Sequence, residues 1–161
     1  MVTVELVQEH FEYRDGDLIR KINRQGRNAN KGSVAGCIDP YGYRKIRFEN
    51  HSYRVHRLVW FMHYGFFPIS IDHIDGNRLN NKIENLREAT SKQNNQNRKL
   101  SSRNTSGIKG VNWDNVCNKW VARIYNGTKN LNLGRFTDIK DAENAVMLKR
   151  IELHGEFTCH G

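Results

Sequence analysis

Residues 71–94 constrain the fold of this chain more than any other segment. Asp72 and His73 lie near its start, after an apolar residue, and an extended backbone would direct their side chains to opposite faces. A strand end or a β-bulge would direct both toward one site. The sequence Asp75-Gly76-Asn77 follows and predicts a turn, because Gly and Asn tolerate a positive φ. The segment therefore begins as a short strand that leads into a polar loop.

The end of the same segment predicts the start of a helix. Thr90 and Gln93 have the spacing of a capping box, which places Asn94 in the first helical turn. A strand, a loop and a helix start can thus gather a His, an Asp and several amides around one site. Carboxylate and amide oxygens suit a hard cation such as Mg²⁺, and a neutral His suits proton abstraction.

This segment resembles the HNH nuclease motif, in particular that of the phage HNH homing endonucleases. The resemblance is carried by Asp72-His73, Asn85, Asn94, the Asp-Gly-Asn turn and an Asn-Leu-Arg sequence. The motif folds as a ββα-metal finger. The resemblance implies that His73 is the general base and that Asn85 holds the loop and His73 in place. It also implies that Asp72 and Asn94 bind one Mg²⁺ or Mn²⁺ per active site. We expect the other polar loop residues to shape the loop rather than bind metal: Asp75, Asn77, Asn80 and Asn81.

The charge of the chain indicates a polyanionic partner. Its 161 residues include 26 Lys and Arg against 17 Asp and Glu, a formal net charge of +9. This balance favours a polyanionic partner, with a merely basic soluble protein as the alternative. The resemblance implies that the partner is double-stranded DNA. No apolar stretch reaches the roughly 18 residues of a membrane span, and the N-terminus lacks the basic start of a signal peptide. We therefore expect an intracellular protein that is not secreted and binds no membrane. The resemblance to phage endonucleases implies a phage-encoded protein that acts in the host cytoplasm.

The N-terminal part combines helical and strand-like patterns. Residues 3–13 fit an amphipathic helix, and residues 43–48 and 53–56 fit the strands of a hairpin. Residues 57–64 are apolar on almost all sides and predict a buried helix that ends before Gly65. We expect His56 to be structural, with a contact to the scissile phosphate as the alternative. The residues of this part and of the motif that we assign to DNA binding are Arg24, Arg27, Lys45, Arg47 and Arg87. For the most basic stretch, residues 14–31, a solvated loop that does not contact phosphate is the alternative.

Residues 98–106 are polar and basic, and they predict a linker. Arg98, Lys99 and Arg103 have no acidic residue among them, so we expect the linker to follow DNA, with a plain flexible tether as the alternative. The predicted domains are a nuclease domain at 1–97 and a second domain at 107–161.

The second domain predicts a sheet followed by a helix. Residues 108–113, 119–125 and 131–133 read as strands, and Asp138 can cap the helix that follows. The Gly-Val-x-Trp, Lys-Trp-x-Ala-x-Ile, Leu-Gly-x-Phe and Ala-x-x-Ala patterns resemble the Apetala-type DNA-binding domain, which lays a three-stranded sheet in the major groove. The residues then expected to face DNA are Asn112, Lys119, Val121, Arg123, Tyr125, Asn130 and Asn132. A sheet with a purely structural role is the alternative.

These patterns predict an α+β fold. Small N-terminal strands and a helix lead into the ββα-metal finger, and a three-stranded antiparallel sheet packed on one helix follows. The predicted function is that of a site-specific, homing-type DNA endonuclease that hydrolyses phosphodiester bonds with one divalent metal and acts as a monomer on DNA. The alternatives are a DNA-binding regulator with an inactive finger and a non-specific nuclease. Plasmid cleavage with Mg²⁺ discriminates these three functions.

Overall fold

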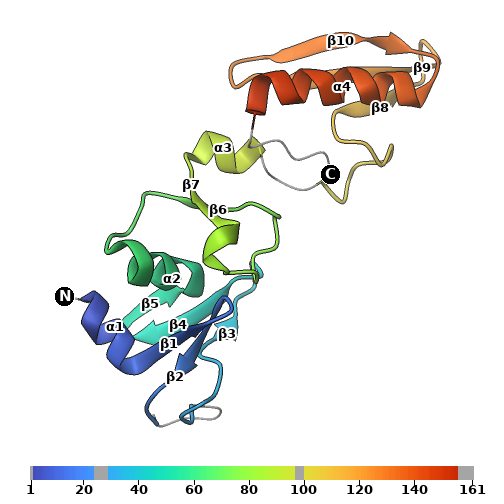
Figure 1. The fold of residues 1–161 in the computed structure, drawn as a ribbon. Coiled ribbons are helices and arrows are strands. Elements are labelled where there is room, and N and C mark those ends of the chain that lie inside the picture. The colour runs from blue at the N-terminus through green and yellow to red at the C-terminus, as the bar shows by residue number, and fades with distance from the viewer. Residues whose placement is uncertain (1, 24–28, 97–99, 156–161) are drawn as a thin grey trace. The chain divides into compact units, whose positions relative to one another are not determined.

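The computed structural model describes residues 2–23, 29–96 and 100–155. Arg24, Arg27, Arg98 and Lys99, all assigned to DNA binding from the sequence, lie outside the described residues. The chain forms two compact units, residues 1–90 and 91–161 (Figure 1). Both units combine helices with small antiparallel sheets, which confirms the predicted α+β class. Among the described residues, no helix is long and apolar enough to cross a membrane.

The first unit contains three small antiparallel sheets, β1–β2, β3–β4–β5 and β6–β7. In chain order its elements are α1 (Val4–His10), β1 (Phe11–Arg14), β2 (Asp17–Arg20), β3 (Cys37–Ile38), β4 (Arg44–Phe48), β5 (His51–Arg54), α2 (Val55–Tyr64), β6 (Ile71–His73), the 3₁₀ helix η1 (Ile83–Asn85) and β7 (Leu86–Glu88). Helix α1 is shorter than the predicted helix because Phe11 begins β1. The side chain of Phe11 is 2% exposed and packs against the ring of Phe48, with 5.3 Å between the ring centroids.

Helix α2 forms the centre of the first core. Its side chains Leu58 and Val59 are fully buried, as the apolar pattern on all sides predicts. Gly65 ends the helix in the left-handed conformation, with φ of 77°. The prediction of a strand through His56 is wrong, because α2 begins at Val55. His56 therefore lies in the first turn of a helix and is buried.

The second unit is a three-stranded antiparallel sheet with a helix on one face, as predicted. Its elements are α3 (Ser91–Gln96), β8 (Val111–Asp114), β9 (Lys119–Tyr125), β10 (Asn130–Phe136) and α4 (Ile139–His154), with β9 central in the sheet. Helix α4 packs along the three strands (Figure 1). Ala122 of β9 lies with Ala142 and Val146 of α4 in a small core. Asp138 caps α4 by accepting a hydrogen bond from the backbone N of Lys140 at 2.8 Å.

Candidate active site

The predicted site is built on a short antiparallel pair of strands. In β6 and β7, Asp72 lies opposite Arg87, and His73 lies opposite Leu86. All three residues of β6 are buried. Residues 74–82 and η1 connect the two strands, so β6 ends directly at the polar loop. A strand of three residues between a core helix and a loop thus buries Asp72 and His73 together.

His73 lies in an enclosed and weakly polar environment. Its side chain is 5% exposed, and its Nε2 atom lies 3.2 Å from Oδ1 of Asn81. Burial lowers the pKa of His73 below its usual value, against the opposing effects of the Asn81 hydrogen bond and the charges of Asp75 and Asp72. The imidazole is therefore neutral at neutral pH, which is the protonation state that a general base requires.

Two rings flank His73. The ring centroid of His56 lies 5.0 Å from that of His73, and the centroid of Tyr43 lies 6.0 Å away. Burial, followed by the charges of His73 and nearby arginines, lowers the pKa of His56 to about 3, so this ring is also neutral. The guanidinium carbons of Arg54 and Arg78 lie 4.0 Å and 5.0 Å from the centroid of Tyr43. Two positive charges therefore lie against the Tyr43 ring, which in turn lies beside His73.

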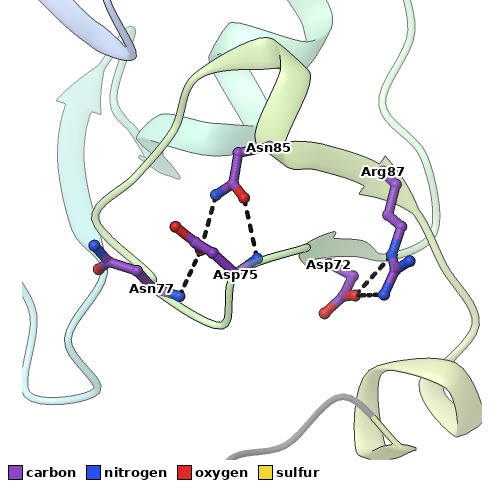
Figure 2. Close-up of polar contacts among 5 residues, drawn as sticks. All are labelled: Asp72, Asp75, Asn77, Asn85 and Arg87. Atoms are coloured by element: carbon purple, nitrogen blue, oxygen red, sulfur yellow. Dashed lines mark hydrogen bonds and ion pairs between the residues drawn. The ribbon is translucent and has the colours of Figure 1, made fainter. Parts of the chain in front are cut away.

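Asn85 closes the loop through its amide. Its Nδ2 donates to Oδ1 of Asp75 at 3.0 Å, and its Oδ1 accepts from the backbone N of Asp75 at 3.1 Å (Figure 2). The same Nδ2 also donates to the backbone oxygen of Asn80 at 2.8 Å. Asp75 also accepts from the backbone N of Asn77 and from Nδ2 of Asn80, both at 2.7 Å. Burial raises the pKa of Asp75, but these hydrogen bonds outweigh that effect and lower it. The loop conformation thus depends on a charged Asp75 and on Asn85.

Asp72 and Arg87 form a buried ion pair. Nη2 and Nε of Arg87 lie 2.8 Å and 2.9 Å from the same oxygen, Oδ2 of Asp72, and the two side chains are 15% and 8% exposed (Figure 2). Arg87 was assigned to DNA binding from the sequence, whereas the structure pairs it with the carboxylate of Asp72.

The donor atoms of the proposed ligands fit a hard divalent cation. Asp72 offers a carboxylate and Asn94 an amide oxygen, the ligand types that Mg²⁺ and Mn²⁺ accept. Within the described part of the chain, no group of three or more His, Cys, Asp or Glu residues could hold a metal. The proposed ligand pair, Asp72 and Asn94, contains only one residue of these four types. Asn94 belongs to α3 in the second unit.

The described residues assigned to DNA binding, apart from Arg87, are all exposed: Lys45, Arg47, Arg103, Asn112, Lys119, Arg123, Tyr125, Asn130 and Asn132. In the three-stranded sheet of the second unit, Arg123 lies opposite Asn132 and Tyr125 lies opposite Asn130. Directly opposed residues share a face of a sheet. Val121, which was expected to face DNA, shares a face with its strand partners Asn112 and Arg135 but is only 4% exposed between them.

Four residues near His73 escaped the sequence-based site assignment: Tyr43, Arg54, Arg78 and Asn81. Asn81 was expected to shape the loop, and its burial at 1% exposure is the property that sets it apart from the neighbouring Asn80. The alternating pattern of β4 indicates a strand, but no local pattern indicates that Tyr43 approaches a loop far along the chain. Arg54 and Arg78 are recognisable only through their contact with Tyr43.

Comparison with known proteins gives a consistent result. A family model described as HNH endonuclease matches residues 53–96, which include Asp72, His73, Asn85 and Asn94. Protein 3.8 of Escherichia phage T7 is 39% identical over 106 residues, or 65% of this chain and 87% of that protein. The "SPbeta prophage-derived putative HNH homing endonuclease YosQ" of Bacillus subtilis (strain 168) is 39% identical over 64 residues, or 35% of this chain and 37% of that protein. No solved structure matches the chain.

Proposed function

Because the chain belongs to the HNH endonuclease family, we propose that it is a site-specific, homing-type endonuclease that cuts double-stranded DNA. The observation that carries this proposal is a buried, neutral His73 that directly follows the buried carboxylate of Asp72 in one short strand. The similarity to YosQ, which is named as a homing endonuclease, supports the homing assignment. HNH nucleases act on DNA and generally use a divalent metal.

In the proposed mechanism, His73 accepts a proton from a water molecule. The water oxygen attacks the phosphorus in line with the leaving 3′ oxygen. The bond between phosphorus and that oxygen breaks, and the products carry a 5′-phosphate and a 3′-hydroxyl. Asn85 maintains the loop through its hydrogen bonds to Asp75 and Asn80. Asp72 and Asn94 would hold one Mg²⁺ or Mn²⁺, which would supply stabilisation of negative charge at the phosphate.

Positive charge near His73 supports phosphate as the group that is bound. The guanidinium groups of Arg54 and Arg78 both lie over the Tyr43 ring, and Tyr43 lies beside His73. Nη1 of Arg78 also donates to the backbone oxygen of Tyr41 at 2.7 Å, which limits the positions of its guanidinium. Held arginines are well suited to hydrogen-bond phosphate oxygens. We assign these two side chains to the DNA backbone at the cut.

The second unit supplies the proposed base recognition. The chain patterns that resemble an Apetala-type domain coincide with a sheet whose exposed face carries Arg123, Asn132, Tyr125 and Asn130 in directly opposed pairs. Such a face suits the major groove, where Arg and Asn can form paired hydrogen bonds with base edges. The basic segment at 98–106 would follow the DNA backbone. A monomer with one finger would cut one strand in each event.

Cleavage of plasmid DNA tests the proposal directly. The full chain is incubated with supercoiled and linear plasmid that contains a library-selected target, with Mg²⁺, with Mn²⁺ and with EDTA. A site-specific endonuclease gives discrete nicks or fragments only with metal. A smear of fragments indicates a non-specific nuclease, and tight DNA binding without any product indicates a regulator with an inactive finger.

A further inference from the structure

Asn81 is a buried polar residue whose environment is unusual for a loop amide. Its side chain is 1% exposed, and its Oδ1 lies 3.2 Å from Nε2 of His73. Its Nδ2 is buried and has no hydrogen-bond partner among the described residues. Native proteins rarely bury an unpaired donor, because the lost hydration is not replaced. We therefore attribute the burial of Asn81 to the contact between its Oδ1 and His73, and not to a stabilising effect of the whole amide group.

The turn between β1 and β2 supports the backbone at Asn81. Gly16 has φ of 90°, and a Cβ atom at that position would lie 2.7 Å from the backbone N of Lys82 and 3.0 Å from the backbone C of Asn81. On the same side, the hydroxyl of Tyr13 accepts a hydrogen bond from the backbone N of Ile83 at 3.1 Å. The N-terminal hairpin, which lies outside the matched residues 53–96, thus contacts the loop directly after Asn81.

We propose that Asn81 is a positioning residue that, supported by the β1–β2 turn, keeps the proton of neutral His73 on Nε2. A carbonyl oxygen has no proton to donate, so a hydrogen bond between Oδ1 of Asn81 and Nε2 requires Nε2 to be the donor. A neutral imidazole carries a single N–H, so Nδ1 retains the lone pair that accepts the proton of the attacking water. The catalytic meaning of this tautomer rests on the proposed function, but the tautomer itself does not.

Nitrogen NMR of His73 tests the tautomer without any cleavage reaction. The full chain, labelled with ¹⁵N at histidine, is measured without DNA at pH 8, with His73→Gln used to assign the signals. We expect the Nε2–H form to dominate for wild type and to lose that dominance in Asn81→Leu, which removes the acceptor oxygen. A dominant Nδ1–H form in wild type, or an unchanged tautomer in Asn81→Leu, overturns the proposal.

Kinetics test the consequence for the reaction. Loss of a group that orients a neighbouring functional side chain typically lowers activity about 10–100-fold. We therefore expect Asn81→Leu to lower kcat by about that factor while DNA affinity changes less than about twofold. A normal kcat in a folded Asn81→Leu protein overturns the positioning role. Failure of wild type to cut any DNA would instead reject the proposed function, and the NMR result would still stand.

Two glycines provide a matched test of the turn. Gly16 and Gly32 have φ of 90° and 83°, so alanine causes similar backbone strain at both, but a Cβ at Gly32 meets no atom within 4 Å. We expect Gly16→Ala to lower kcat about 10-fold or more and Gly32→Ala to leave it within about twofold. In the Asn81→Leu background, Gly16→Ala should add little, because both changes act through one contact. Equal losses in the two glycine variants, or fully additive losses, overturn the role of the turn. If Gly16→Ala fails to fold, Asn81→Leu and the NMR experiment decide the proposal.

Discussion

Two nitrogen atoms of Arg87 donate to a single oxygen of Asp72 across the β6–β7 pair, at 2.8 Å and 2.9 Å. The arrangement places a guanidinium against the proposed metal ligand, which is only 8% exposed. It also orients the carboxylate, because Arg87 approaches it from the opposite strand. The same pair thus affects both the stability of the finger and the carboxylate that would bind metal.

The Asp72–Arg87 pair predicts a large loss of stability when Arg87 is removed. Arg87→Ala leaves a buried carboxylate without its cation, which typically costs about 3–5 kcal/mol of unfolding free energy. Urea unfolding followed through NMR signals of α2 measures this loss for the first unit. Arg14→Ala is the control, since Arg14 pairs with Glu12 at 3.1 Å while both side chains are exposed, and such a pair contributes about 0–1 kcal/mol. Equal effects of the two variants would contradict the stabilising role of Asp72–Arg87.

The general base makes the second prediction. His73→Ala should lower the cleavage rate by at least about 10²-fold, because general-base catalysis contributes at least that much. DNA affinity measured by fluorescence anisotropy should remain near the wild-type value. The matched control is His63→Ala, which removes a histidine of α2 that the mechanism does not use. Near-normal cleavage by His73→Ala at neutral pH would exclude His73 as the base.

The third prediction concerns the metal. Asp72→Ala and Asn94→Ala should each remove cleavage in Mg²⁺. Mn²⁺ should partly restore cleavage by Asn94→Ala, because Mn²⁺ generally binds nitrogen and oxygen ligands more tightly than Mg²⁺ does. Cleavage rates across a metal titration provide the measurement, and isothermal titration calorimetry of Mn²⁺ binding provides a readout separate from activity. Full cleavage by either variant in EDTA would show that the reaction proceeds without the cation.

The exposed face of the second sheet predicts two different effects on DNA recognition. Arg123→Ala should relax preference at one or two base pairs, since an Arg that grips guanine contributes about 1–3 kcal/mol of discrimination. Lys119→Ala should weaken binding to all sequences alike and reduce the salt slope by about one. Competitive cleavage of a target library measures both. Lys140→Ala on α4 is the control, because α4 covers the other face of the sheet. Unchanged target preference in Arg123→Ala would contradict base recognition by this face.

Burial of His56 predicts acid sensitivity of the first unit. Its pKa is about 3 in the folded chain and near 6.5 when unfolded, so between these values the unfolded state binds a proton that the folded state does not. Stability therefore falls as pH decreases from about 6.5 toward 3, by up to about 1.4 kcal/mol per pH unit for this group. Urea unfolding at pH 7, 6 and 5 measures the slope. His56→Gln should reduce it, and His51→Gln, which changes an exposed ring, should not.

The sequence predicts those parts of the molecule that are determined by residues close together in the chain. Asp72 and His73 are recognisable because a turn and an Asn-Leu-Arg sequence follow at short distances, and the buried helix α2 is recognisable because nearly all its residues are apolar. The start of α2 was misplaced because residues 53–56 alternate like a strand, while packing against the core extends the helix to Val55. Tertiary contacts thus override a local preference at this boundary.

The parts that could not be predicted depend on contacts between distant segments. Asn81 and Asn80 are adjacent and chemically identical, yet only Asn81 is buried against His73. The ring of Tyr43 lies 6.0 Å from that of His73 although the two residues are far apart in the sequence, and the local sequence around Tyr43 has no feature that specifies this neighbour. The outward position of Val121 follows from alternation, but its burial depends on the strands on either side.

The close approach of Gly16 to the backbone of Lys82 also limits how the finger can be transplanted. A graft of residues 53–96 into another scaffold would carry the histidine, the carboxylate and the loop amides, yet it would leave behind Tyr13 and Gly16. The amide of Ile83 would lose its acceptor, and the backbone beside Asn81 would face solvent. The smallest transferable nuclease module in this chain therefore begins at the N-terminal hairpin, well before the recognisable motif.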